Sequence, residues 1–166
     1  MRVLAIDPGY ERLGIAIVEK QNKKDVLVHS ECFRTSAKLP HPERLRNIGN
    51  RLIEVIHEFE PDSLSIETLF FTNNQKTAMR VAEARGVILY TAASHNLKIF
   101  EYTPLQIKIA VTSYGKSDKQ QMMAMIPKLI KINKEIEFDD EYDAIACGIT
   151  CLASNFHHQQ EKKLLL

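Results

Sequence analysis

The chain has 166 residues, 45% hydrophobic and 26% charged, so it can bury one ordinary globular core without disulfides or a structural metal. Twenty-two Lys and Arg against 21 Asp and Glu leave a net charge of +1, which by itself indicates no partner. The composition excludes collagen-like and low-complexity chains, and no apolar run reaches 18 residues, so we expect no membrane span. An acid as early as Asp7 argues against a signal peptide, and three unpatterned cysteines favour the reducing cytoplasm.

The first part of the chain has the pattern of a strand meander. Residues 3–6 form a short apolar run that is closed by Asp7, Pro8 and Gly9, a strong turn signal. Residues 13–18 resume as a strand, which predicts a hairpin, and a third strand is expected near residues 26–33.

The rest of the chain alternates helices and strands. Apolar residues step by threes and fours from Leu45 to Phe59, which predicts an amphipathic helix ending before Pro61. The further expected elements are a strand over 63–66, a helix over 75–94, a strand over 99–102, a helix starting at Pro104, and helices over 117–132 (kinked at Pro127) and 140–154.

This order of elements predicts the fold class. Strands in a meander that then alternate with helices imply an α/β domain with a mixed five-stranded sheet flanked by helices. Because no linker or repeat divides the chain, we expect one domain over residues 1–156 and a frayed tail over 157–166.

Charge is concentrated late in the chain. Residues 104–134 hold six lysines and one acid, a net charge of +5, and residues 135–143 hold six acids and no base. Most charge runs are solvated surface. A basic segment beside a cluster of carboxylates is also what a protein needs to hold a polyanion over a cation site.

Four acids stand where a catalytic metal site is plausible. Asp7 and Glu67 each follow directly on an apolar strand, and Asp140 and Asp143 are three apart at a helix start and share a face. Packed carboxylates stay ionised only with cations among them, which predicts Mg²⁺ or Mn²⁺ and phosphodiester hydrolysis. The alternative is an Asx turn at Asp7 and acids that serve a helix dipole.

Five short motifs in register resemble the RuvC family of Holliday-junction resolvases, over a span from Arg2 to about Leu152. They are Asp7-Pro8-Gly9 with Gly14, Ile66-Glu67 with Leu69-Phe70, Ala84-Arg85-Gly86, Phe100-Glu101-Tyr102, and Asp140-x-x-Asp143-Ala144-Ile145-Ala146. The resemblance implies a ribonuclease H-like fold, a homodimer, and Mg²⁺-dependent nicking of two strands at a four-way DNA junction. It implies two metal ions per site, held by Asp7, Glu67, Asp140 and Asp143, with Mn²⁺ as a possible substitute.

The resemblance also implies roles for aromatic and basic residues. Phe70, with Phe71 beside it, falls where the family has an aromatic suited to stacking on an unpaired base, and the alternative is core packing. Lys108 and Lys119 match basic positions near the scissile phosphate, and the alternative is solvated helix surface. Further candidates for phosphate contact are Lys116, Arg85 and Arg80.

Several points stay open at this stage. Asp139 stands beside Asp140, so either one is a candidate ligand, and Glu11 and Arg12 lie where they can alter the charge of the site. A net charge of +1 is low for a junction binder, which leaves broader cutting of branched DNA, or of RNA, as an alternative. A junction-binding scaffold without chemistry is a second alternative, and a branch-migration motor is a possible partner.

Overall fold

A five-stranded mixed sheet forms the centre of the computed structural model, which describes residues 1–22, 24–69 and 75–164. The strands are β1 (Arg2–Asp7), β2 (Arg12–Gln21), β3 (Lys24–Arg34), β4 (Ser63–Glu67) and β5 (Lys98–Tyr102), in the order β3-β2-β1-β4-β5. The first three strands pair antiparallel, whereas β4 pairs parallel with both β1 and β5. This confirms the predicted meander, the mixed sheet and the α/β class.

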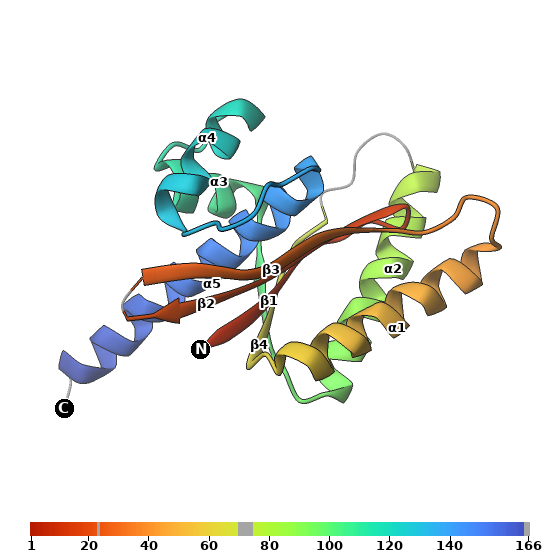
Figure 1. Ribbon diagram of the computed structural model, residues 1–166, viewed down its shortest axis with the longest axis horizontal. Coiled ribbons are helices and arrows are strands. Elements are labelled where there is room, and N and C mark those ends of the chain that lie inside the picture. The colour runs from red at the N-terminus through yellow and green to blue at the C-terminus, as the bar shows by residue number, and fades with distance from the viewer. Residues whose placement is uncertain (23, 70–74, 165–166) are drawn as a thin grey trace.

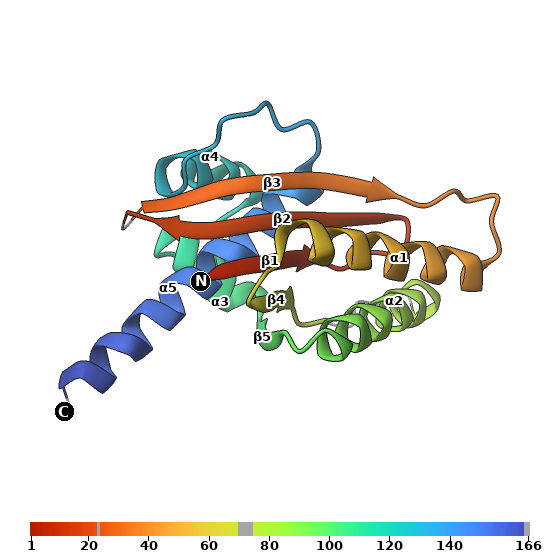
Figure 2. The ribbon, with the colours of Figure 1, turned by 60° about the horizontal axis from the view of Figure 1, so that its bottom comes forward.

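Helices cover both faces of the sheet (Figures 1 and 2). One face carries α1 (His41–Phe59) and α2 (Gln75–Ser94), and the other carries α3 (Pro104–Thr112), α4 (Lys119–Leu129) and α5 (Asp139–Leu164). Strand alternation supplies both cores: Val3 and Ala5 of β1 face α5, whereas Leu4 and Ile6 face α1 and α2.

Helix α1 follows from the periodicity of its apolar residues. Ile48, Leu52 and Val55 are fully buried against the sheet, as expected for one apolar stripe. The helix ends at Phe59, and Glu60 takes a left-handed conformation with φ of 46° immediately before Pro61. The predicted helix and its end are therefore confirmed.

Two helices differ in length from the prediction. Helix α4 begins after Asp118, whose side chain accepts a hydrogen bond from the Gln121 amide, and ends at Leu129, so Pro127 lies in its last turn and not in mid-helix. Helix α5 continues to Leu164, whereas the sequence predicts an end at Ser154. The physical reason is that no Gly or Pro follows Gly148 to stop the helix.

None of the described helices is both long enough and apolar enough to cross a membrane.

Candidate active site

Two carboxylates meet at one edge of the sheet. Asp7 is the last residue of β1 and Glu67 is the last residue of β4. The two strands are parallel neighbours with Ile6 opposite Ile66, so the residues that follow emerge side by side. Both side chains line one cavity, so the two acids meet as the sequence predicts.

The start of α5 adds two further carboxylates to this edge. The negative charges of Asp143 and Asp140 both raise the pKa of Asp7, so these side chains lie near it. Asp139 is more exposed than Asp140: 41% of its side chain is exposed, against 14% for Asp140. Both acids pair with Arg12, and Asp139 also pairs with Lys119. The structure thus brings Asp140 toward Asp7 and turns Asp139 toward the lysine.

Gly14 makes the close approach of α5 possible. It is the register partner of Asp7 on β2, and a Cβ built there would lie 2.1 Å from the Asp140 carbonyl oxygen and 3.1 Å from the Asp7 Cβ. Both neighbours belong to the site and one is backbone, so neither can yield without moving a carboxylate. Glycine at this position therefore sets the distance between α5 and the sheet.

We expect Gly14→Ala to displace the start of α5. The overlap should lower the free energy of unfolding by about 1–3 kcal/mol. Misplacement of Asp140 should reduce DNA cutting by roughly 100-fold. Gly115→Ala is the matched control, since the nearest atoms to its Cβ belong to the exposed side chains of Leu105 and Ile109, and the closest is the flexible end of Leu105. Chemical denaturation and a nicking assay check both variants, and equal behaviour of the two would contradict this role for Gly14.

Burial and crowding shift the pKa values of the site. Burial, followed by the charges of Asp143, Glu67 and Asp140, raises the pKa of Asp7 to about 8, against a smaller opposing effect of Lys119. Burial and then Asp143 raise the pKa of Glu67 to about 7, which Lys108 opposes. Burial also raises the pKa of Asp143, although Lys119 acts against it. The metal-free cluster therefore disfavours its own full ionisation.

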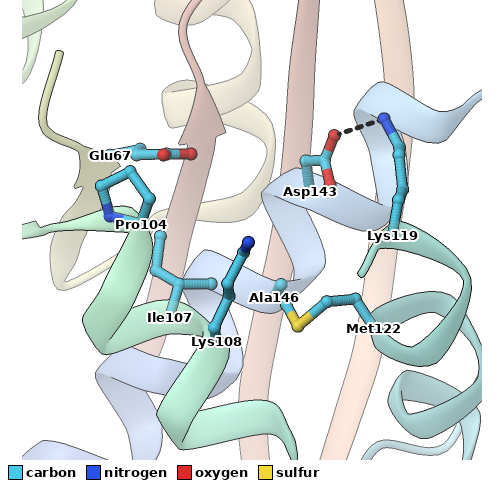
Figure 3. Close-up of a pocket in the computed structure, with 8 residues that line it drawn as sticks. All are labelled: Glu67, Pro104, Ile107, Lys108, Lys119, Met122, Asp143 and Ala146. Atoms are coloured by element: carbon cyan, nitrogen blue, oxygen red, sulfur yellow. Dashed lines mark hydrogen bonds and ion pairs between the residues drawn. The ribbon is translucent and has the colours of Figure 1, made fainter. Parts of the chain in front are cut away.

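Two lysines face these carboxylates across a cavity of about 260 Å³ (Figure 3). The Glu67 and Asp143 carboxylates lie on opposite sides of it, and Lys108 of α3 points between them. The Lys119 Nζ donates hydrogen bonds to Asp139 at 2.6 Å and to Asp143 at 3.0 Å. These bonds raise the pKa of Lys119 even though its partial burial acts to lower it.

The other predicted contact residues lie in different surroundings. The Arg85 guanidinium is bound to the Glu101 carboxylate and donates to the Glu67 carbonyl oxygen at 3.3 Å, so it braces the end of β4. Arg80 lies over the Tyr10 ring, with 5.6 Å from Cζ to the centroid, and Lys116 is exposed between α3 and α4. The predictions for Phe70 and Phe71 fall on residues outside the described part of the chain.

Some features of the site are missed by sequence reasoning. One is the pair of hydrogen bonds from Lys119 to Asp139 and Asp143. The position of Lys119 follows from the capping box of α4, in which the side chains of Asp118 and Gln121 each accept a hydrogen bond from the other's backbone amide. That Asp-x-x-Gln signal is readable in the sequence and places Lys119 at the first helical residue. The hydroxyl of Thr68 gives no such signal: it is buried, it has no hydrogen-bond partner within the described residues, and Thr68 lines a second cavity with Asp7 and Glu67.

The carboxylate and hydroxyl oxygens of the site are suitable ligands for a hard cation, although they are not arranged around a common point. Among the described residues, no three His, Cys, Asp or Glu side chains are arranged as a formed metal site. The charges of Asp143, Glu67 and Asp140 nevertheless all raise the pKa of Asp7, and the unpartnered Thr68 hydroxyl lines a cavity with Asp7 and Glu67. All-oxygen donors of this kind fit Mg²⁺ or Mn²⁺.

The fold and the clustered carboxylates define a class, the ribonuclease H-like nucleases. Residues 3–151 match the family described as "Crossover junction endodeoxyribonuclease RuvC". A protein of that description from Alkaliphilus metalliredigens is 43% identical over 96% of each chain, and one from Finegoldia magna is 40% identical over 98% of this chain and all of its own. The chain belongs to this family of crossover junction endodeoxyribonucleases.

Solved structures agree with this assignment. The structure described as "T. thermophilus RuvC in complex with Holliday junction substrate" superposes with a TM-score of 0.84 at 31% identity, covering 90% of this chain and 92% of that one. The yeast mitochondrial Holliday junction resolvase Ydc2 has a TM-score of 0.69 over 99% of this chain and 84% of its own, and at 18% identity it supports the fold alone. The resemblance stated from the motifs is therefore confirmed.

Proposed function

We propose that this protein resolves four-way DNA junctions by Mg²⁺-dependent hydrolysis of one phosphodiester in each of two strands. The observation that carries the proposal is the convergence of Asp7, Glu67, Asp140 and Asp143 at one sheet edge, with Lys108 and Lys119 facing them. Membership of a family of junction endodeoxyribonucleases supports DNA, not RNA, as the substrate.

The four carboxylates would hold the metal ions, two per site, with Asp7 at the centre because the charges of the other three all act on it. Bound Mg²⁺ would supply an activated water and stabilise the leaving oxygen. Mn²⁺ has the same preference for oxygen ligands and should substitute for it.

The lysines have a separate task. Lys108 lines the cavity between Glu67 and Asp143, where a phosphate oxygen would lie, and its positive charge would offset the charge that develops there. Lys119 is tied to Asp139 and Asp143, so it fixes the start of α5 as well as adding positive charge.

A nicking assay tests the proposal. Labelled four-way junction, replication fork, linear duplex and structured RNA are digested side by side, with Mg²⁺ or with EDTA. We expect paired cuts in the four-way junction only when Mg²⁺ is present. Preferential RNA cleavage, or undiminished cutting in EDTA, would contradict the proposal.

We further propose that the protein acts as a homodimer, because cutting two symmetry-related strands requires two sites. Helix α2 offers a contact surface. Met79 and Tyr90 are 66% and 75% exposed, and eleven residues are three helical turns, so they lie on one face. Large apolar side chains exposed in this way are typical of an interface.

We expect Met79→Lys/Tyr90→Lys to convert a dimer of 19.0 kDa subunits into a monomer. The charges would have to be buried in the contact, which is costly. Sedimentation velocity measures the change, and junction cuts should become single nicks. Leu105→Lys/Ile109→Lys is the control, since these exposed apolar residues lie on α3, which covers the opposite face of the sheet. A dimer that persists in the α2 variant would exclude this surface.

A further inference from the structure

An arginine groove lies next to the carboxylates, at the ends of β2 and β3. It has a volume of about 500 Å³ and is lined by Arg12, Arg34 and Arg44 with Glu11, Thr35 and Ala37. Three guanidinium groups thus face a single carboxylate, that of Glu11, whose side chain is 62% exposed. An excess of arginine over acid in one concave surface indicates an anionic ligand.

Two of these arginines lie directly opposite each other. Arg12 begins β2, Arg34 ends β3, and their Cα atoms are register partners across the antiparallel pair. Like charges at such a position destabilise a sheet. Arg12 is neutralised by Asp140 at 3.4 Å and Asp139 at 3.7 Å, whereas no carboxylate in the described part of the chain forms an ion pair with Arg34. Arg34 is exposed and contacts the Phe138 ring at 5.8 Å, which leaves its charge uncompensated.

The third arginine, Arg44, is held in a fixed position by its neighbours. The Arg44 side chain is only 5% exposed, its Nε donates to the Thr35 hydroxyl at 2.8 Å, and its Nη2 donates to the Tyr10 carbonyl oxygen at 3.3 Å. Its guanidinium also stacks 4.8 Å from the centroid of the Tyr10 ring. A buried guanidinium held from both sides is preorganised, so it loses little side-chain entropy when an anion binds.

We propose that this groove binds a backbone phosphate of the cut DNA strand, next to the position of cleavage. Arginine forks match the oxygens of a phosphate in a bidentate geometry. Arg12 belongs both to the groove and to the edge of the carboxylate cluster, so a strand crossing the cluster meets the groove next. The inference rests on the proposed function, and it assigns Arg34 as the residue that gains most from the bound phosphate.

The test measures how junction binding depends on salt. Full-length protein is titrated onto a fluorescent four-way junction in EDTA, over a range of NaCl concentrations, for the wild type and for Arg34→Gln. We expect the slope of log K against log salt to become shallower by about 1 for Arg34→Gln, because one phosphate contact is lost. Arg34→Lys should keep the slope but bind several-fold more weakly, since it retains the charge and loses the fork.

Arg46→Gln is the matched control, because Arg46 is an exposed arginine of α1 outside the groove lining. It should leave the salt slope unchanged. Equal slopes for wild type and Arg34→Gln, or an equal loss in both Gln variants, would overturn the proposal. A further arm follows thermal stability in inorganic phosphate: stabilisation that Arg34→Gln abolishes, with an unchanged junction slope, would assign the groove to free phosphate and overturn the DNA assignment. Cutting by the wild type in Mg²⁺, measured on the same junction, separates these outcomes from failure of the proposed function.

Discussion

Replacing Asp7 by Asn is expected to reduce junction cutting roughly a thousandfold, while junction binding stays near the wild-type value. Asp7 is the carboxylate on which the charges of Asp143, Glu67 and Asp140 all act, so it is the central member of the cluster. Asparagine keeps the shape and removes the charge, so the proposed metal ions would lose the carboxylate at the centre of the cluster. The lysines and arginines proposed to contact the DNA are unchanged, and binding should therefore persist.

The same substitution should stabilise the protein when no metal is present. Asp7 is buried among acids and its pKa is about 8, so its ionisation above that pH costs folding free energy. We expect the metal-free Asn variant to be more stable than the wild type by about 2–5 kcal/mol at pH 8.5. Urea unfolding in EDTA and a single-turnover nicking assay measure the two effects.

A matched carboxylate outside the cluster provides the control. Asp118 caps α4, and asparagine caps a helix as well as aspartate does, so Asp118→Asn should keep both activity and stability. Cutting by Asp7→Asn at near the wild-type rate, or a loss of metal-free stability at pH 8.5, would contradict the central role of Asp7.

Metal-free wild-type protein is expected to lose stability as the pH rises from 5 to 8.5, and Mg²⁺ is expected to restore it. In the native state the pKa of Asp7 is raised from 3.8 to about 8 and that of Glu67 from 4.5 to about 7. The native state therefore binds more protons than the unfolded state between roughly pH 4 and 8. Its stability is greatest below that range and falls as the two groups are forced to ionise.

Other acids do not reverse this trend. Burial acts to raise the pKa of Glu31 and Glu141, but their hydrogen bonds outweigh this effect and lower the pKa. Their contribution to the free energy of unfolding therefore changes only at more acidic pH. Urea unfolding at pH 5, 7 and 8.5, in EDTA and in Mg²⁺, measures the dependence. The loss should be several kcal/mol in EDTA and much smaller in Mg²⁺ or in Asp7→Asn. Stability that is level or rises with pH in EDTA would show that the carboxylates are not mutually repelling.

Much of the fold is readable from local patterns. The meander, the amphipathic α1 and the capped start of α3 follow from alternation, periodicity and the Thr103-Pro104 signal. Two helices differ from the prediction for different reasons. Helix α4 begins after its cap Asp118 and not at Ser117, which the capping box reveals, whereas α5 continues to Leu164 because no Gly or Pro follows Gly148.

The site is predictable only as far as strand ends can be recognised. Asp7 and Glu67 end apolar strands, but their meeting depends on β1 pairing with β4, which no local pattern encodes. The difference between Asp139 and Asp140 is likewise tertiary, because it depends on Lys119 reaching Asp139 from α4 and on Asp140 packing against β2 at Gly14. The arginine groove is harder still to predict from the sequence, because Arg12 and Arg34 come together only through the register of β2 and β3.

Anomalous diffraction from crystals soaked in Mn²⁺ tests the central claim most directly. Manganese positions between the carboxylate oxygens of Asp7 and Glu67, with Asp143 or Asp140 completing the coordination, are the predicted result. A map in which ordered manganese lies only elsewhere on the protein, with this sheet edge empty at saturating Mn²⁺, would contradict the account.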